Sequence, residues 1–525
     1  MFRKIFTLLI VIILYLLYAR FVLVPQQYTN FSLIDDGQDI KYGQDLNNCL
    51  TQHDCNALIG QYTQGEGGKS RIVYWFIQSL LYQGGKGLNP EFQHNIRIYV
   101  LGTMVVTLFT GIALMANADP LAIVLGNAIF ITNYSFSENI IRLGPIEPYQ
   151  VFLLAVFSVL FLYREKIFKN NFLLGYLSVN LSLILFFLIK ETSIALLPVL
   201  VFLDLLFEEK RELIKNTLYY LIPTIIFVGV KMLMGKGSGI GTVYVNDYDL
   251  NIPFIIQNAK NFISILLVST SPFIKIVLAV TLLCLLFSKT RKLIFSKDLL
   301  FWLFLFVSFT AILFPWKYVL DRYLLISVFC LSMFVTLLFS KLMKIAETSN
   351  HVKKYKLVYH LVMLFILFIL FFRGFPVNLA RTINYRNWFL TAAQFEMDQV
   401  KAISKYTDNK VYLNLSGDIN NLEIVYEIPI YLKYLYNGSS ETEKLAGQLL
   451  PSNGYLLSRY PLEPEIVLDT ISESGYKLLE SNNYYISQID PIAFRELFKK
   501  NPILALENPP LFNEKLHYYW EVRKL

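Results

Sequence analysis

The chain is dominated by apolar runs of about 20 residues, each long enough for a helix to cross the ~30 Å hydrocarbon layer of a membrane. Only 16% of its 525 residues are charged, compared with roughly a quarter in ordinary globular proteins. These features exclude a disordered chain, a collagen, a coiled coil and a disulfide-stapled miniprotein. They predict a polytopic α-helical membrane protein with about 11 transmembrane helices.

The first span is expected at about Ile5 to Val24. We interpret it as a retained anchor because it lacks a small-residue cleavage site with a polar flank. The later spans are centred near residues 105, 127, 156, 181, 200, 226, 280, 307, 331 and 365.

The basic residues indicate the orientation of these spans. The formal net charge is +8, but Lys and Arg lie in short loops between apolar runs, which is typical of a topology signal and not of a nucleic-acid site. Arg3 and Lys4 before the first span place the N-terminus in the cytoplasm. An odd number of spans then places the C-terminus on the exoplasmic side of what we expect to be a bacterial inner or plasma membrane. The loops assigned to the cytoplasm contain Arg164, Lys166, Lys169, Lys210, Arg211, Lys215, Lys289, Arg291, Lys292, Lys297, Lys341, Lys344, Lys353, Lys354 and Lys356.

Two regions are expected outside the membrane. Within a transmembrane domain of residues 1–375, the first outer loop of about residues 25–95 contains an amphipathic segment, 70–82, suited to lying in the membrane interface. Residues 376–525 combine a helical stretch, Trp388 to Tyr406, with a strand-like run, Lys410 to Leu415, and with turn signals such as Asn437-Gly438. They predict a small exoplasmic α/β domain.

The cysteines and the metal-type motifs give weak signals. Cys49 and Cys55 share the outer loop, where either a local disulfide or two free thiols would fit. No cluster of His and Cys indicates a metal site, and we assign no metal ligands. Asp247 and Asp249 have a spacing that can hold a divalent cation beside a phosphate, but a solvated loop is the simpler interpretation.

Charged residues gather at the outer ends of the predicted spans, where ionisable groups usually face a cavity or a partner. The adjacent carboxylates Asp35 and Asp36 repel each other, and burial would raise the pKa of at least one, as a general base requires. The alternative is that Asp36-Gly37 simply makes a turn.

A second polar segment lies between the third and fourth predicted spans. Glu138 and Arg142 are four residues apart, so they would share a helix face and could form an ion pair before Gly144 and Pro145 break the helix. With Glu147 they could line a site or cap a surface turn, and we favour the site.

Two further segments open apolar stretches, Lys190-Glu191 and Asp321-Arg322-Tyr323. The basic groups could bind a phosphate, with arginine the better fork for its oxygens and Asp321 ordering Arg322. The alternative is that the basic side chains snorkel to the membrane surface, and this fits Lys190 better than Arg322.

In these features the chain resembles the GT-C superfamily of membrane glycosyltransferases, in particular protein O-mannosyltransferases and the aminoarabinose transferase that modifies lipid A. The likeness rests on Asp35-Asp36 opening a long outer loop, on Lys190-Glu-Thr-Ser followed by Pro198, on Asp321-Arg-Tyr-Leu-Leu, and on the C-terminal domain. It covers about residues 1–375. The acidic pair departs from the Asp-Glu of many relatives.

The resemblance implies transfer of a sugar from a polyprenyl-phosphate donor to an acceptor hydroxyl on a glycan, lipid or protein, at the exoplasmic face and with inversion. The expected roles are catalytic for Asp35 and Asp36, phosphate-binding for Arg322, Lys190 and Arg142, and substrate-binding for Glu138, Glu147, Glu191, Asp321 and Tyr323. No cofactor is certain, although a divalent cation could take part. Nucleic acid is not an expected partner.

Two other functions were weighed. A polysaccharide polymerase or ligase acting on lipid-diphosphate donors would be expected to use basic residues in a large late loop. A lipid or oligosaccharide flippase would be expected to show charges near the bilayer midplane and two related halves. The early acidic pair and the one-sided polar groups favour the glycosyltransferase.

Overall fold

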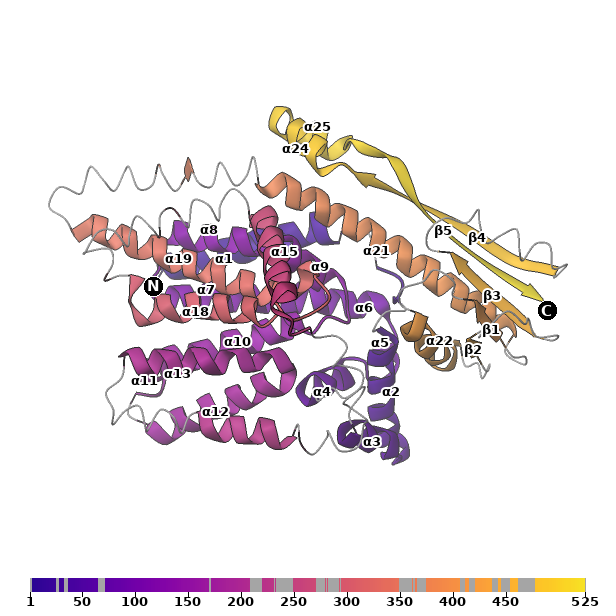
Figure 1. Cartoon of the computed structure of the whole chain (residues 1–525), viewed down its shortest axis with the longest axis horizontal. Helices are drawn as coiled ribbons and strands as arrows, with labels where there is room; N and C mark the ends of the chain where they lie inside the picture. The colour runs from indigo at the N-terminus through magenta and orange to yellow at the C-terminus, as the bar shows by residue number, and fades with distance from the viewer. Residues whose placement is uncertain are drawn as a thin grey trace.

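The computed structural model places most of the chain. The described residues are 2–24, 28–32, 36–64, 71–169, 171–207, 220–230, 249–270, 294–348, 374–406, 411–414, 421–436, 442–444, 454–460 and 477–524, with a few isolated positions between them. They form a large helical part, a C-terminal sheet and a long helix that reaches from one to the other (Figure 1).

The apolar runs of the sequence form most of the helices in the helical part. Among the described residues, three helices are long and apolar enough to cross a membrane: Arg3–Leu23, Pro90–Met115 and Asp321–Lys344. A fourth joins them if Pro120–Ile131 and Tyr134–Ile141, which meet at 60°, count as one broken span. The expected spans near residues 280 and 365 fall almost wholly outside the described ranges, so the total of about 11 stays a prediction.

The elements of the helical part follow the order of the predicted apolar runs. They are α1 (Phe2–Tyr18), η1 (Ala19–Leu23), α2 (Asp36–Gln52), α3 (Asn56–Gln64), α4 (Ile72–Leu81), α5 (Gly84–Gly87), α6 (Pro90–Asn95), η2 (Ile96–Leu101), α7 (Gly102–Met115), α8 (Pro120–Ile131), α9 (Tyr134–Ile141), α10 (Glu147–Leu162), α11 (Arg164–Phe168), α12 (Phe172–Ile189), η3 (Glu191–Ala195), α13 (Leu196–Phe207), α15 (Ile252–Thr270), α18 (Lys297–Ala311), η4 (Asp321–Leu324) and α19 (Leu325–Thr348).

Helix α19 lies at the centre of the helical part. It packs against α18, α8 and α10, and its predicted span is far more enclosed by protein than the first one, Arg3–Leu23. Aromatic rings fill the contacts around it: Phe329 of α19 meets Phe109, Phe130 and Trp302 at centroid distances of 5.3–5.9 Å. Cys330 is buried beside them with a free thiol.

The first outer loop is mostly helical. The predicted interfacial segment is α4, which packs against α2. Gly43 of α2 allows this, because a Cβ there would collide with the backbone of Tyr82 just after α4. Cys49 and Cys55 are joined in a disulfide between α2 and α3, which decides between the two states that the sequence left open.

The C-terminal region contains a mixed five-stranded sheet of order β2-β1-β3-β5-β4. The parallel strands are β1 (Val411–Asn414), β2 (Thr442–Lys444) and β3 (Tyr455–Tyr460), and the long antiparallel hairpin is β4 (Lys477–Ile489) with β5 (Leu511–Lys524). Helices α22 (Asn421–Tyr436), α24 (Pro491–Lys500) and α25 (Pro502–Glu507) complete it. The predicted strand at Lys410 to Leu415 is confirmed as β1, whereas the expected turn at Asn437-Gly438 lies outside the described residues.

Helix α21 (Phe375–Ile403), continued by η6 (Ser404–Tyr406), includes the predicted helical stretch but is much longer, at 29 residues. It packs against α9 and η1 of the helical part and against α24, β4 and β5 of the C-terminal region. In Figure 1 it runs obliquely from the helical part to the strands, with the β4–β5 hairpin along it.

Candidate functional site

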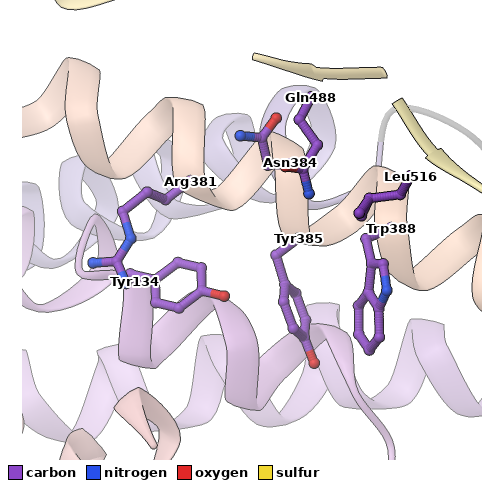
Figure 2. A pocket seen from close by; sticks show the side chains of 7 residues that line it. All are labelled: Tyr134, Arg381, Asn384, Tyr385, Trp388, Gln488 and Leu516. Carbon is purple, nitrogen blue, oxygen red and sulfur yellow. The ribbon is translucent and has the colours of Figure 1, made fainter. Parts of the chain in front are cut away.

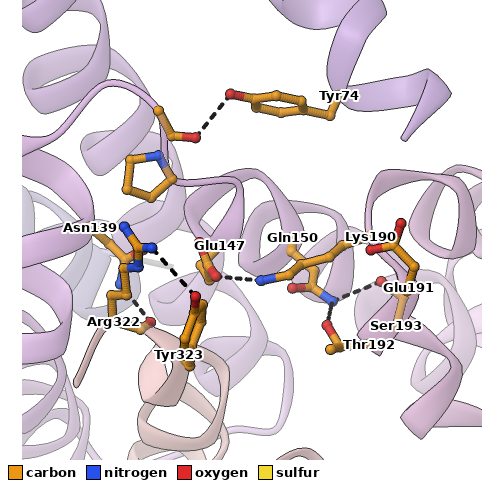
Figure 3. A network of polar contacts seen from close by, with 12 residues as sticks. Tyr74, Asn139, Glu147, Gln150, Lys190, Glu191, Thr192, Ser193, Arg322 and Tyr323 are labelled. Atoms are coloured by element: carbon orange, nitrogen blue, oxygen red, sulfur yellow. Dashed lines mark hydrogen bonds and ion pairs between the residues drawn. The ribbon is translucent and has the colours of Figure 1, made fainter. Parts of the chain in front are cut away.

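The predicted site segments meet at the beginning of α10. Glu147 opens this helix, and its Oε1 accepts a hydrogen bond and ion pair from the Nζ of Lys190, which follows α12 (Figure 3). Both side chains are largely buried, with 5% and 11% of their surfaces exposed. Lys190 therefore does not snorkel to the surface, because a buried carboxylate holds its ammonium group.

Arg322 and Tyr323 of η4 lie next to this pair. The Nζ of Lys190 is 5.1 Å from the centre of the Tyr323 ring, and the Arg322 guanidinium is 5.2 Å from the same ring. Asn139 of α9 fixes the backbone here, since its Nδ2 donates to the carbonyl of Arg322 at 2.8 Å. Segments more than 180 residues apart in the sequence thus supply one polar network.

Arg97 stabilises the loop between α9 and α10. This arginine is 2% exposed, and its guanidinium donates to the carbonyls of Asn139 and Pro145. It also lies 5.0 Å from the ring centre of Tyr149. Arg97 occurs inside an apolar run of the sequence, where no neighbouring residue indicates its role. Its only signal was a charged residue within a predicted span.

A second support comes from the outer loop. Tyr74 of α4 donates to the carbonyl of Gly144 at 2.9 Å and to the carboxylate of Asp39 in α2 at 3.1 Å. Gln78, one turn along α4, donates to the same carboxylate at 2.8 Å. Helix α2 is thereby tied to the loop that carries Glu147. Neither Asp39 nor Tyr74 was predicted as a site residue, because the two are 35 residues apart in the sequence and meet only in the fold.

The segment after Lys190 is also held by polar contacts. Gln150 of α10 donates to Thr192 at 3.1 Å and to Ser193 at 2.8 Å. Glu191, expected in the substrate site, forms an ion pair with Arg71 at the start of α4 at 3.3 Å. This pairing joins the interfacial helix to the same network.

One expected partnership is wrong. The carboxylate of Asp321 does not order Arg322; it forms an ion pair with Arg381 of α21 at 3.0 Å. Helix α9 ends at Ile141, so Arg142 has an extended backbone, with φ −74° and ψ 146°. Arg142 is still close enough for its charge to act on Glu138, and the expected pairing of these two residues stays a prediction. The backbone amide of Arg142 still donates to the carbonyl of Glu138 at 3.3 Å.

The acidic pair is described only in part, since Asp35 lies outside the described residues. Asp36 is the first residue of α2 and is 1% exposed, and its Oδ2 accepts a hydrogen bond from the amide of Ser32 at 2.8 Å. The carboxylate thus joins Ser32 to the first turn of α2. Asp36 and Gly37 are the first residues of a helix and not an isolated turn, and a chemical role for the acidic pair stays a prediction.

Helix α22 of the C-terminal region contacts both Ser32 and the start of α2. The amide of Gly37 donates to Glu427 of α22 at 3.0 Å, and the hydroxyl of Tyr431 donates to the carbonyl of Ser32 at 2.6 Å. Burial and the nearby carboxylates of Glu427, Asp36 and Glu396 raise the pKa of Tyr431 well above its usual value, so this hydroxyl keeps its proton and stays a donor.

The possible divalent cation has no supporting cluster. Among the described residues, no group of three or more His, Cys, Asp or Glu side chains is placed to hold a metal ion. Asp247 lies outside the described residues. Asp249 uses its carboxylate to accept the amide of Asn251 at 2.9 Å.

Comparison with known proteins adds a relationship of fold. No family model matches the sequence, and no curated protein matches it at the sequence level. The crystal structure of ArnT from Cupriavidus metallidurans in the apo state matches with a TM-score of 0.50 and 12% identity, covering 89% of this chain and 95% of that chain. The chain has the fold of ArnT. The structure of ArnT bound to undecaprenyl phosphate matches equally, with a TM-score of 0.50, 13% identity, and coverage of 89% and 96%.

This shared fold confirms the expected resemblance at the level of the fold. It agrees with a mostly helical architecture that has several apolar helices and a C-terminal mixed sheet. The likeness extends beyond the expected residues 1–375, because 89% of the chain is covered. The number and direction of the spans remain predictions.

Proposed function

We propose that this chain is an integral membrane glycosyltransferase that moves a sugar from a polyprenyl-phosphate donor to an acceptor hydroxyl on the exoplasmic face. The observation that carries the proposal is the fold shared with ArnT, one of whose structures is bound to undecaprenyl phosphate. The polar network at the start of α10 supports it, because a charged lipid head needs cationic groups beside an apolar surface.

Arg322 is the proposed principal ligand of the donor phosphate. Its backbone is fixed by Asn139 and its guanidinium lies beside Tyr323, and a planar fork of donors suits phosphate oxygens. Lys190 is held by Glu147, so we assign it to the wall of the phosphate site, where its charge is oriented and partly neutralised. Arg142 would contribute from the extended segment after α9.

Asp35 is the proposed general base, with Asp36, the first residue of α2, orienting it or replacing it in that role. The base would take the proton of the acceptor hydroxyl as its oxygen attacks the anomeric carbon, while the lipid phosphate leaves on the opposite face. Positive charge from Arg322 would stabilise the departing phosphate. A single displacement without a covalent intermediate gives inversion at the anomeric carbon.

The test measures transfer from radiolabelled polyprenyl-phosphate sugars in membranes that contain the wild type, Asp35→Asn or Asp36→Asn. At least one variant should be expressed normally and lose about 100- to 10,000-fold of its activity, the usual size of a general-base contribution. Asp54→Asn, in an exposed turn of the same outer loop, is the matched control and should keep full activity. Full activity in both Asp35→Asn and Asp36→Asn would overturn the assignment of the base.

A further inference from the structure

A cavity of about 350 Å³ lies where α9, α21 and the β4–β5 hairpin meet. This volume falls within the range of roughly 300–1,000 Å³ that small-molecule sites occupy. Figure 2 shows the rings of Tyr385 and Trp388 extending side by side from α21, with Tyr134 and Arg381 together at one end. Its lining residues are Tyr134, Arg381, Asn384, Tyr385, Trp388, Gln488 and Leu516.

The aromatic walls of the cavity are held by neighbouring groups. The rings of Tyr385 and Trp388 have centroids 5.5 Å apart, and the indole Nε1 of Trp388 donates to the hydroxyl of Tyr518 at 2.7 Å. Asn384 is fixed because its amide makes two hydrogen bonds, of 2.8 and 2.7 Å, with the backbone of Ile489 in β4. The shape of the cavity therefore depends on packing between α21 and the sheet.

The cavity borders the polar network of the candidate site. Arg381 forms its ion pair with Asp321, the residue next to Arg322, and its guanidinium lies 4.1 Å from the centre of the Tyr134 ring. Because Asp321 neutralises Arg381, the lining carries no unbalanced charge that would select an anion. Aromatic faces combined with a few polar groups suit a neutral, hydroxyl-rich ring instead.

We propose that this cavity is a carbohydrate-binding subsite. The weakly positive C–H face of a sugar ring would lie on the negative faces of Tyr385 and Trp388, while Gln488 and Arg381 would bind its hydroxyl groups. The inference rests on the proposed glycosyltransferase function, and it assigns the binding of a substrate's sugar ring to this cavity. The ring could belong to a glycan acceptor or to the donor.

Binding can be measured without any transfer reaction. Saturation-transfer NMR is recorded on the purified full chain in nanodiscs with methyl glycosides of hexoses, 6-deoxyhexoses, N-acetylhexosamines and pentoses. At least one glycoside should receive saturation at its ring protons. Leu516→Trp, which fills the cavity, should abolish this signal, and Trp388→Leu should weaken binding about 2- to 10-fold, the size of a lost aromatic contact.

Controls separate this result from misfolding. Tyr485→Ala removes an exposed ring of β4 outside the cavity and should leave saturation unchanged. Gln488→Leu preserves the aromatic walls and should still weaken binding, so the inference stays testable if Leu516→Trp fails to fold. The subsite would be overturned if no glycoside gave a signal. It would also be overturned if the signal were unchanged in every cavity variant that folds, out of Leu516→Trp, Trp388→Leu and Gln488→Leu.

The source of the sugar follows from kinetics in the transfer assay. A raised KM for the acceptor in Gln488→Leu supports an acceptor subsite, and a raised KM for the donor supports binding of the donor sugar. Cavity-dependent glycoside binding without transfer from any polyprenyl-phosphate sugar would support the subsite and contradict the proposed function.

Discussion

Buried charges at the start of α10 were predictable as residues but not as pairs. Glu147, Lys190 and Arg322 stand out in the sequence because charges at the ends of apolar spans are costly and need partners. Which partner each one takes depends on long-range packing: Lys190 pairs with Glu147, 43 residues away, and Asp321 with Arg381, 60 residues away. Arg97 stands alone in an apolar run, and the partners of Asp39, which are Tyr74 and Gln78, lie 35 and 39 residues away.

The Lys190–Glu147 pair can be tested by a double-mutant cycle. Lys190→Met leaves a buried carboxylate without its cation, which typically costs about 3–5 kcal/mol of stability. The double variant Lys190→Met/Glu147→Leu should recover most of this loss, because neither charge then remains buried. Thermal unfolding of the purified protein in detergent measures both effects. If the loss in the double variant equals the sum of the losses in Lys190→Met alone and Glu147→Leu alone, the two side chains act independently.

At the scale of elements, local sequence predicted the helices and β1 but not their neighbours. The apolar runs and the amphipathic segment became α4, α10 and α19, since length and periodicity fix them. The length of α21 was missed because its N-terminal half is too polar for a span, although Gly374 and Pro376 mark its start. The contact between α2 and α22 joins residues almost 400 positions apart, and no local pattern indicates it.

Helix α22 should stabilise Ser32 and the start of α2, next to the acidic pair. Gly37 lies so close to it that a Cβ there would be 2.9 Å from the Glu427 carboxylate. That carboxylate also lies at the positive end of α2. Glu427→Leu and Tyr431→Phe, which each remove one hydrogen bond, should each speed hydrogen exchange at residues 28–40, by an amount corresponding to about 1 kcal/mol per lost hydrogen bond.

Tyr434→Phe is the matched control on the same helix, because its hydroxyl contacts Asp45 farther along α2 at 3.4 Å. Exchange at residues 28–40 should stay at the wild-type rate in this variant. If Glu427→Leu and Tyr431→Phe also left the exchange rate unchanged, α22 would not stabilise the start of α2.

At the scale of the whole molecule, composition was sufficient for the class of protein, and short motifs were sufficient for the likeness that the ArnT fold confirms. The number of spans, their direction and the division at about residue 375 remain predictions, because length and apolarity alone support three or four spans within the described residues.

A reporter measures the direction. Alkaline phosphatase fused after Leu525 should be active, because the distribution of basic loops puts this end on the exoplasmic side. The same reporter fused after Lys210, in a loop expected in the cytoplasm, should be inactive. The reverse result would mean that the count of spans is off by one, and that the polar network faces the cytosol.

Helix α21 has a mechanical consequence. It is one uninterrupted rod of 29 residues, anchored to α9 and η1 near one end and to the β4–β5 hairpin along its length. The rod offers no joint at which the sheet could swing independently, so a rotation of the sheet would move Arg381 and Tyr385 with it. A binder that clamps the outer surface of the hairpin would therefore restrict the movement of Arg381 and of Asp321, with which it forms an ion pair.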